Sequence, residues 1–289
     1  MPTHPAPSFY RRRVREALRK AREHAGHTQR EAARELDWSM SKLVRIEAGS
    51  VGVSITDLRA MLALYGVEDA DRVNELVGMT RASKERPWFS KFENVLSPAF
   101  AQYLGYEGSA SVIRGFQPLT IPGLLQTDDY ARAVIEASRV DEIDERVELR
   151  TTRQELLERP DRPEIYYILD EAALHRNVGG AAVMRSQLRH LRDLAKEPRL
   201  SVRIIPFSAG AHTSMKGSFT ILEFADWDED VLYLETAGGS VTSREDQKSI
   251  ADYRENFELL TEMALEDEDS VALIEERIND LLNVESPRN

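Results

Sequence analysis

The chain has 289 residues, of which 42% are hydrophobic and 30% charged, a size and balance that suit about two globular domains. It contains no cysteine, which excludes disulfides, Cys-based zinc sites and cysteine nucleophiles and favours a reducing, cytoplasmic location. The net charge of −12 argues against nucleic acid as a partner until the charge is followed along the chain.

The N-terminal part of the chain is basic, although the whole is acidic. Residues 1–86 carry 16 Lys and Arg against 12 Asp and Glu, and the excess is concentrated in residues 10–22. Such a local excess is typical of a nucleic-acid contact, although a run of this kind also occurs on solvated helix faces. The start of the chain lacks the apolar segment of a signal peptide, and no window approaches a transmembrane helix, so we expect no membrane association.

Four short helices are expected in residues 10–66. The first spans 10–25 with apolar residues at helical spacing, and Gly26 follows as a C-terminal cap. Thr28 and Glu31 form a capping box that starts the second helix. A turn at Asp37-Trp38 leads to a third helix, capped by Ser39, that buries Leu43 and Ile46 and ends at Gly49. Two short helices joined by so brief a turn must cross steeply.

This order of caps, buried positions and turn resembles the Xre-type, phage-repressor-like helix-turn-helix family over residues 10–67. The resemblance implies a sequence-specific regulator of transcription that binds double-stranded DNA through the helix 39–47. It places Met40, Ser41 and Arg45 at base-reading positions, with Arg45 suited to donate bidentately to guanine. It also implies phosphate contacts for Gln29, Ser39 and Lys42.

Each of these assignments has a simpler alternative. Ser39 is also explained as a helix cap, Lys42 as a solvated side chain, and Met40 as a residue that fills space rather than one that reads a thymine methyl group.

The remainder of the chain mixes helices with strands, which predicts an α+β domain with a small, mostly antiparallel sheet. We therefore expect an all-α helix-turn-helix domain over 1–67, a helical connector over 68–87 and an α+β domain over 88–289. The expected strands are 110–118 (a strand or an extended segment), 164–169, 200–207, 217–224 and 231–236. The expected long helices are 98–106, 127–138, 141–158, 183–195, 244–260 and 269–282.

This second domain contains none of the common catalytic or metal-binding motifs, so we predict no enzyme activity, no metal and no cofactor. Glu171 and His175 lie four residues apart, and we interpret them as an ordinary side-chain contact on one helix rather than as metal ligands. Asp170, just before them, is interpreted as the cap of that helix. A small-molecule effector pocket is a second possibility, formed by residues from a strand and a glycine-bounded loop. Its candidate residues are Tyr166, His212, Ser214 and Lys216, together with the aromatics Tyr167, Phe219 and Tyr233, which are also explained as core residues of strands.

The segments IPGLLQTDDYA, DEAALHR and IIPF, with KGSF and the ALEDEDS stretch, resemble the domain of unknown function of actinobacterial WhiJ-like, antitoxin-like regulators. The resemblance covers about residues 88–282 and implies modulation by a small BldB-like protein encoded nearby; it transfers no ligand and no active site. A small-molecule-responsive regulator is the alternative.

A homodimer on a palindromic operator is expected, because one short helix makes few base contacts. In the last helix, Val271, Ile274, Ile278 and Leu281 form a stripe that suits either the core or a dimer contact.

Overall fold

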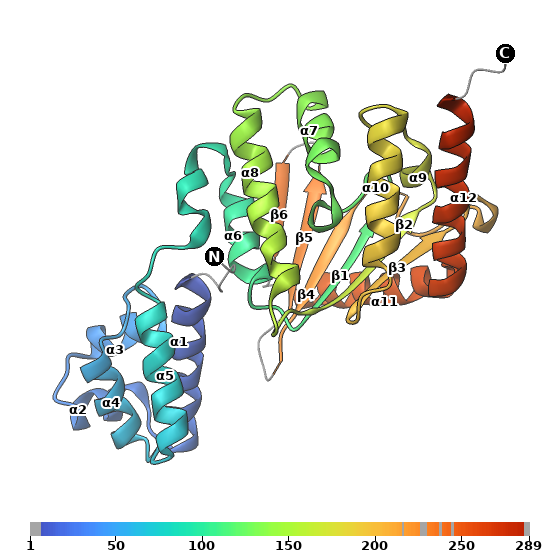
Figure 1. Ribbon diagram of the computed structural model, residues 1–289. Coiled ribbons are helices and arrows are strands. Elements are labelled where there is room, and N and C mark those ends of the chain that lie inside the picture. Colours follow the sequence, from blue (N-terminus) through green and yellow to red (C-terminus); the bar gives the residue numbers. More distant parts are fainter. Residues whose placement is uncertain (1–6, 216, 226–229, 237–238, 244–245, 286–289) are drawn as a thin grey trace. The chain divides into compact units, whose positions relative to one another are not determined.

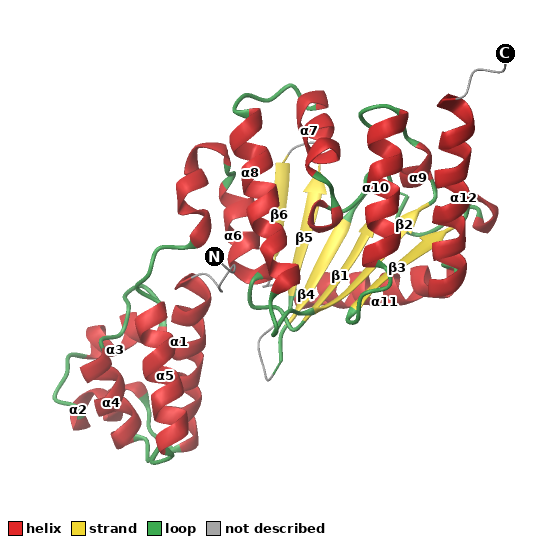
Figure 2. Cartoon of the chain, viewed as in Figure 1, coloured by secondary structure: helices red, strands yellow, loops and turns green. Residues whose placement is uncertain are grey.

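The computed structural model describes residues 7–215, 217–225, 230–236, 239–243 and 246–285, and these divide into two units. One unit ends at Ser90 and is helical, and the other begins at Lys91 and contains both helices and a sheet (Figure 2). The prediction of an all-α helix-turn-helix region followed by an α+β domain is confirmed.

The N-terminal unit is built from five helices around one apolar core (Figure 1). The helices are α1 (Pro7–His24), α2 (Gln29–Glu35), α3 (Met40–Glu47), α4 (Ile55–Leu64) and α5 (Ala70–Ala82). Leu18, Leu43 and Leu58 are fully buried in the core. The predicted capping box of Thr28 and Glu31 is present and fixes where α2 begins.

The expected connector over 68–87 differs from what the structure shows. Its helix α5 packs against α1, because Leu76 and Val77 are buried in the same core as Leu18. Asp69 caps α5 by accepting from the backbone amides of Asp71 and Arg72. This segment is therefore the fifth helix of the N-terminal unit.

The C-terminal unit contains a sheet of six described strands in the order β3-β2-β1-β4-β5-β6. The strands are β1 (Val112–Gln117), β2 (Glu164–Asp170), β3 (Leu200–Ile205), β4 (Phe219–Glu223), β5 (Val231–Thr236) and β6 (Gly239–Ser243). Among them, three of the five pairings are antiparallel, as predicted, while β2 pairs in parallel with both β1 and β3. The sequence did not predict β6, because GSVTS is short and lacks apolar alternation.

Helices cover both faces of this sheet (Figure 1). They are η1 (Trp88–Val95), α6 (Pro98–Glu107), η2 (Gly123–Leu125), α7 (Asp128–Ala137), α8 (Ile143–Gln154), η3 (Glu155–Glu158), α9 (Ala172–His175), α10 (Ala181–Leu194), η4 (Phe207–Ala209), α11 (Gln247–Met263) and α12 (Asp267–Glu285). The face that carries Phe116, Phe219 and Ile221 packs on α11. The opposite face lies under α8 and α10 in Figure 1.

The apolar stripe of the last helix belongs to the core of this unit. Ile274, Ile278 and Leu281 of α12 are buried, and α12 packs along α10 and against β3. Of the two possibilities for this stripe, the structure favours intramolecular packing, so these side chains are not available for a dimer contact.

Candidate nucleic-acid interface

Helix α3 is held in place from its buried side. Ser39 has an extended backbone, and its hydroxyl accepts a hydrogen bond of 3.2 Å from the amide of Lys42, which starts the helix. Leu43 is fully buried and Ile46 nearly so. In the turn before it, Asp37 adopts a left-handed conformation (φ 54°), which lets the chain reverse between α2 and α3. The predicted Asp37-Trp38 turn and Ser39 cap are both confirmed.

The opposite side of α3 faces solvent. Met40 and Val44 are exposed by 47% and 37%, unusual values for large apolar side chains, and Ser41 and Arg45 are exposed beside them. Within the described part of the chain, no hydrogen bond or ion pair engages the guanidinium of Arg45. These four side chains, Met40, Ser41, Val44 and Arg45, form the outer face of α3. They provide the guanidinium donors of Arg45, the hydroxyl of Ser41 and the apolar side chains of Met40 and Val44. Such a set can contact the edges of bases in a groove.

Lys42 lies at the edge of this face and has partners within the protein. Its ammonium donates to a carboxylate oxygen of Asp57 at 2.7 Å and sits 3.6 Å from the centre of the Trp38 ring. Burial raises the pKa of Asp57, but hydrogen bonds from Lys42 and Ser54 outweigh it, so the net pKa lies below its ordinary value. Lys42 is therefore held against α4 rather than freely solvated.

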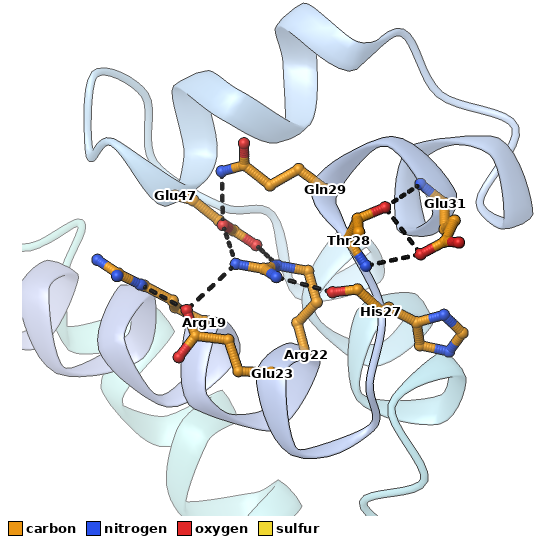
Figure 3. A network of polar contacts seen from close by, with 8 residues as sticks. All are labelled: Arg19, Arg22, Glu23, His27, Thr28, Gln29, Glu31 and Glu47. Atoms are coloured by element: carbon orange, nitrogen blue, oxygen red, sulfur yellow. Dashed lines mark hydrogen bonds and ion pairs between the residues drawn. The ribbon is translucent and has the colours of Figure 1, made fainter.

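Gln29 is tied to the end of α3 (Figure 3). Its side-chain nitrogen donates to a carboxylate oxygen of Glu47 at 2.8 Å. The Gln29 amide is thereby oriented at the first residue of α2, where backbone amides and the helix dipole favour an anion. The geometry is compatible with a phosphate contact and also gives Gln29 a structural role.

Glu47 itself is the centre of a buried polar network (Figure 3). Arg22 of α1 binds it bidentately, with distances of 2.7 Å from Nε and 2.9 Å from Nη2, and donates from Nη1 to the carbonyl of His27 at 2.8 Å. Only 3% of the Glu47 side chain and 9% of that of Arg22 are exposed. The hydrogen bond to Glu47 raises the pKa of Arg22 despite burial. One ion pair thus joins α1, the start of α2 and the end of α3.

The sequence analysis missed this network, although a signal for it exists. Arg22 follows the buried Leu18 by four residues, and Glu47 follows the buried Leu43 by four. Each charged residue therefore continues a buried helix stripe, where an unpaired charge would be too costly.

Several basic side chains of residues 10–22 are buried or bonded to groups within the protein. Arg12 and Arg22 are buried, Arg11 donates to the carbonyl of Ser83, and Arg19 pairs with Glu23 at 2.9 Å. The charge excess of this segment therefore does not by itself mark a DNA contact.

The candidate effector residues are only partly brought together. His212 is buried: its Nε2 lies 3.2 Å from Asp170, and its Nδ1 accepts from the amide of Ser214. Ser214 lines a groove of about 420 Å³ between the loop and α11, whereas Tyr166 donates to Glu164 and lies outside that lining. Lys216 is outside the described residues.

This arrangement does not support a nucleophile at Ser214. The hydroxyl of Ser214 accepts from Asn256 at 2.6 Å, and the His212 nitrogen that faces Ser214 is bonded to its backbone rather than to its hydroxyl. Glu171 and His175 form the expected contact four residues apart, at 3.1 Å. In the described ranges, no three His, Cys, Asp or Glu side chains are grouped as a metal site would require.

In comparisons with known proteins, two different family models match the two units of the chain. A family model described as a helix-turn-helix domain matches residues 13–76. A second model, described as a domain of unknown function (DUF5753), matches residues 100–276. No curated protein and no solved structure matches the chain. None of the helices that the structure describes is both long and apolar enough to cross a bilayer.

These matches agree with the geometry: the first includes the whole of α2, α3 and α4, and the second includes all six described strands. The second also covers more than half of the 289 residues. The chain therefore belongs to the DUF5753 family and carries a helix-turn-helix domain ahead of the domain that defines that family.

Proposed function

We propose that this protein is a sequence-specific, DNA-binding regulator of transcription without enzyme activity. The observation that carries the proposal is the outer face of α3, where Arg45 stands exposed beside Met40, Ser41 and Val44 on a helix anchored from behind. A helix of this length fits one major groove, and the exposed guanidinium of Arg45 can donate two hydrogen bonds to a guanine. The helix-turn-helix match over residues 13–76 supports the same function.

The direct test is selection of binding sites by the full chain from a pool of random duplexes. Enrichment of one motif, and binding of that motif at least a hundredfold tighter than of a shuffled duplex at the same salt concentration, would support the proposal. Equal binding of all duplexes, or no binding at low salt, would contradict it.

The operator is proposed to be palindromic and read by a homodimer. One copy of α3 contacts only a few base pairs, whereas two copies that read half-sites about one helical turn apart reach useful specificity. Because the stripe of α12 is buried, the dimer contact is expected on other surfaces. Sedimentation of the full chain on a selected duplex should give two protomers per duplex; one protomer on a single half-site would refute the dimer.

The C-terminal unit is proposed to receive the regulatory signal. Its resemblance to WhiJ-like, antitoxin-like actinobacterial regulators suggests a small BldB-like protein as the partner, and the alternative is a small-molecule effector. Co-purification of the full chain with the product of a neighbouring BldB-like gene separates the two. A stable complex that changes operator affinity supports the protein partner, and its absence favours the effector.

Lys42 is proposed to exchange its internal partner for a phosphate on binding. We expect Lys42→Ala to weaken binding to all sequences alike and to lower the slope of log K against log salt by about one. Asp57→Asn, which removes the competing carboxylate, should strengthen binding at low salt. Anisotropy titrations at several salt concentrations measure both, with Lys196→Ala of the C-terminal unit as the control. An unchanged slope in Lys42→Ala would remove Lys42 from the phosphate contacts.

A further inference from the structure

A double cavity lies in the C-terminal unit, and its lining includes the effector candidates Tyr167, Phe219 and Tyr233 but not Tyr166 or His212. Its inner chamber, of about 130 Å³, is lined by Tyr103, Gln126, Arg150, Tyr167 and Thr220, among others. Its outer chamber, of about 300 Å³, is lined mainly by hydrocarbon from Val95, Phe100, Val134, Ile135 and Leu149. The two chambers are neighbours, because six residues line both: Phe100, Val134, Arg150, Arg153, Tyr233 and Glu235.

The polar end of the cavity contains two arginines of α8 in different situations. Arg153 is neutralised: it binds Glu107 bidentately at 2.7 and 2.6 Å and also donates to the hydroxyl of Tyr103 at 3.3 Å. Arg150 has one hydrogen bond to a described residue, from Nη1 to the side-chain oxygen of Gln126 at 2.5 Å, and no ion pair with one. Among the described residues Arg150 therefore has no ion pair, and the carboxylate that acts on it is Glu235, which lines the same chambers without bonding to it.

The side chain of Gln126 is held in one orientation and gives Arg150 a hydrogen-bond acceptor but no negative charge. Its side-chain nitrogen donates to the carbonyl of Ile121 at 2.7 Å, which turns its oxygen toward Arg150. Gln126 is 2% exposed, and as an amide it offers a neutral acceptor only. Burial and the nearby charge of Arg153 together lower the pKa of Arg150 to about 10. A guanidinium in this position is stabilised by an anion that enters the cavity.

Glycines at two positions keep the inner chamber open. A Cβ atom at Gly123 would lie 3.1 Å from Nη1 of Arg153 and 3.7 Å from Nε of Arg150, so this turn lets both guanidinium groups pack against its backbone. The ring of Tyr167 lies over Gly115 of β1, where a Cβ atom would clash with it. Both close approaches depend on the missing side chain.

The shape and charge of the cavity select its ligand. A planar guanidinium pairs best with a planar carboxylate, because two parallel hydrogen bonds form at once. Glu235 lines both chambers and disfavours a second negative charge on the ligand. The apolar outer chamber fits a hydrocarbon body attached to the acid. We propose that this double cavity binds a small monocarboxylate with an apolar body, whose carboxylate pairs with Arg150.

Two kinds of ligand share this chemistry. A simple organic acid would use Arg150 alone, whereas an apolar amino acid would also place its ammonium near Glu235. Isothermal titration of the full chain with phenylacetate, hexanoate and L-phenylalanine distinguishes them, since the preferred probe shows whether an amino group contributes. Phenylacetamide, which has the same shape without the charge, is the control ligand.

The expected result is that at least one carboxylate probe binds and raises the melting temperature, while phenylacetamide does not. Arg150→Gln should reduce its affinity at least tenfold without lowering the melting temperature of the free protein, because it removes a desolvated charge. Val134→Phe, which fills both chambers, should also prevent binding. The matched control is Arg132→Gln on α7, where the arginine pairs with Asp144 at the surface and lines neither chamber.

Three results would overturn the proposal: no binding of any carboxylate probe at millimolar concentration, equal binding of phenylacetate and phenylacetamide, or unchanged affinity in Arg150→Gln. The titration contains no DNA, so it is independent of the proposed regulatory function. Arg45→Ala should bind the probe like the parent protein, which keeps a failure of one proposal distinct from a failure of the other.

Discussion

Replacement of Arg45 by Ala is expected to abolish recognition of the operator while the protein stays folded. A bidentate contact between arginine and guanine contributes about 1–3 kcal/mol of discrimination, and the proposed dimer on a palindrome would lose it twice. Arg45 makes no hydrogen bond or ion pair with a described residue, and its side chain is exposed, so its removal leaves no buried group without a partner. Non-specific binding at low salt should change little, because other basic groups and the helix dipoles remain.

The measurement is an anisotropy titration of a selected operator and of a shuffled duplex with parent and variant. Arg81→Ala provides the control, since Arg81 is also an exposed arginine of the N-terminal unit but lies on α5. Its operator affinity should match that of the parent. If Arg45→Ala also bound operator and shuffled duplex with the parent's affinities, the outer face of α3 would not be the reading surface.

Replacement of Glu47 by Ala should destabilise the N-terminal unit by about 3–5 kcal/mol, the usual cost of breaking a buried ion pair from one side. The variant leaves the Arg22 guanidinium buried without its carboxylate and also removes the acceptor of Gln29. Hydrogen exchange of the full chain, read by mass spectrometry in peptides that cover 29–47, reports the loss of protection directly.

Two further variants make this measurement specific. Glu23→Ala breaks an exposed pair with Arg19 and a longer contact of 3.6 Å with Arg22 in the same network (Figure 3), and should reduce protection far less than Glu47→Ala. The double variant Arg22→Met with Glu47→Leu should recover most of the lost stability, since apolar residues of similar size can replace a buried pair. The structural role of the pair would be refuted if Glu47→Ala exchanged no faster than Glu23→Ala.

Local patterns were sufficient to predict the N-terminal helices. The oxygens of Thr28 and Ser39 each cap the helix expected from their spacing, and the positions of Leu43 and Ile46 were enough to orient α3. Caps and helix faces depend on residues three or four apart, so a single sequence contains the necessary information. The expected strands of the second unit are present for the same reason, whereas the polar β6 was not expected.

Contacts between distant segments could not be predicted in this way. Arg22 and Glu47 lie 25 residues apart on different helices, and the cavity around Arg150 is lined by residues of α6, α7, α8 and four strands. Alternation along a strand or helix does not show which charged residues will meet. For the same reason the sequence named aromatic candidates such as Tyr167 and Tyr233 for an effector pocket but could not show that Arg150 lies beside them.

The separation of the two sides of α3 has a consequence for how such regulators diverge. Met40, Ser41, Val44 and Arg45 are exposed, whereas Leu43, Ile46 and Glu47 are buried and hold the helix. Exchanging the first group alters only surface, so relatives can acquire new target sites one substitution at a time without losing their scaffold. Exchanging Glu47 instead disturbs three helices together, so substitutions on the buried side of α3 lower the stability of the whole unit.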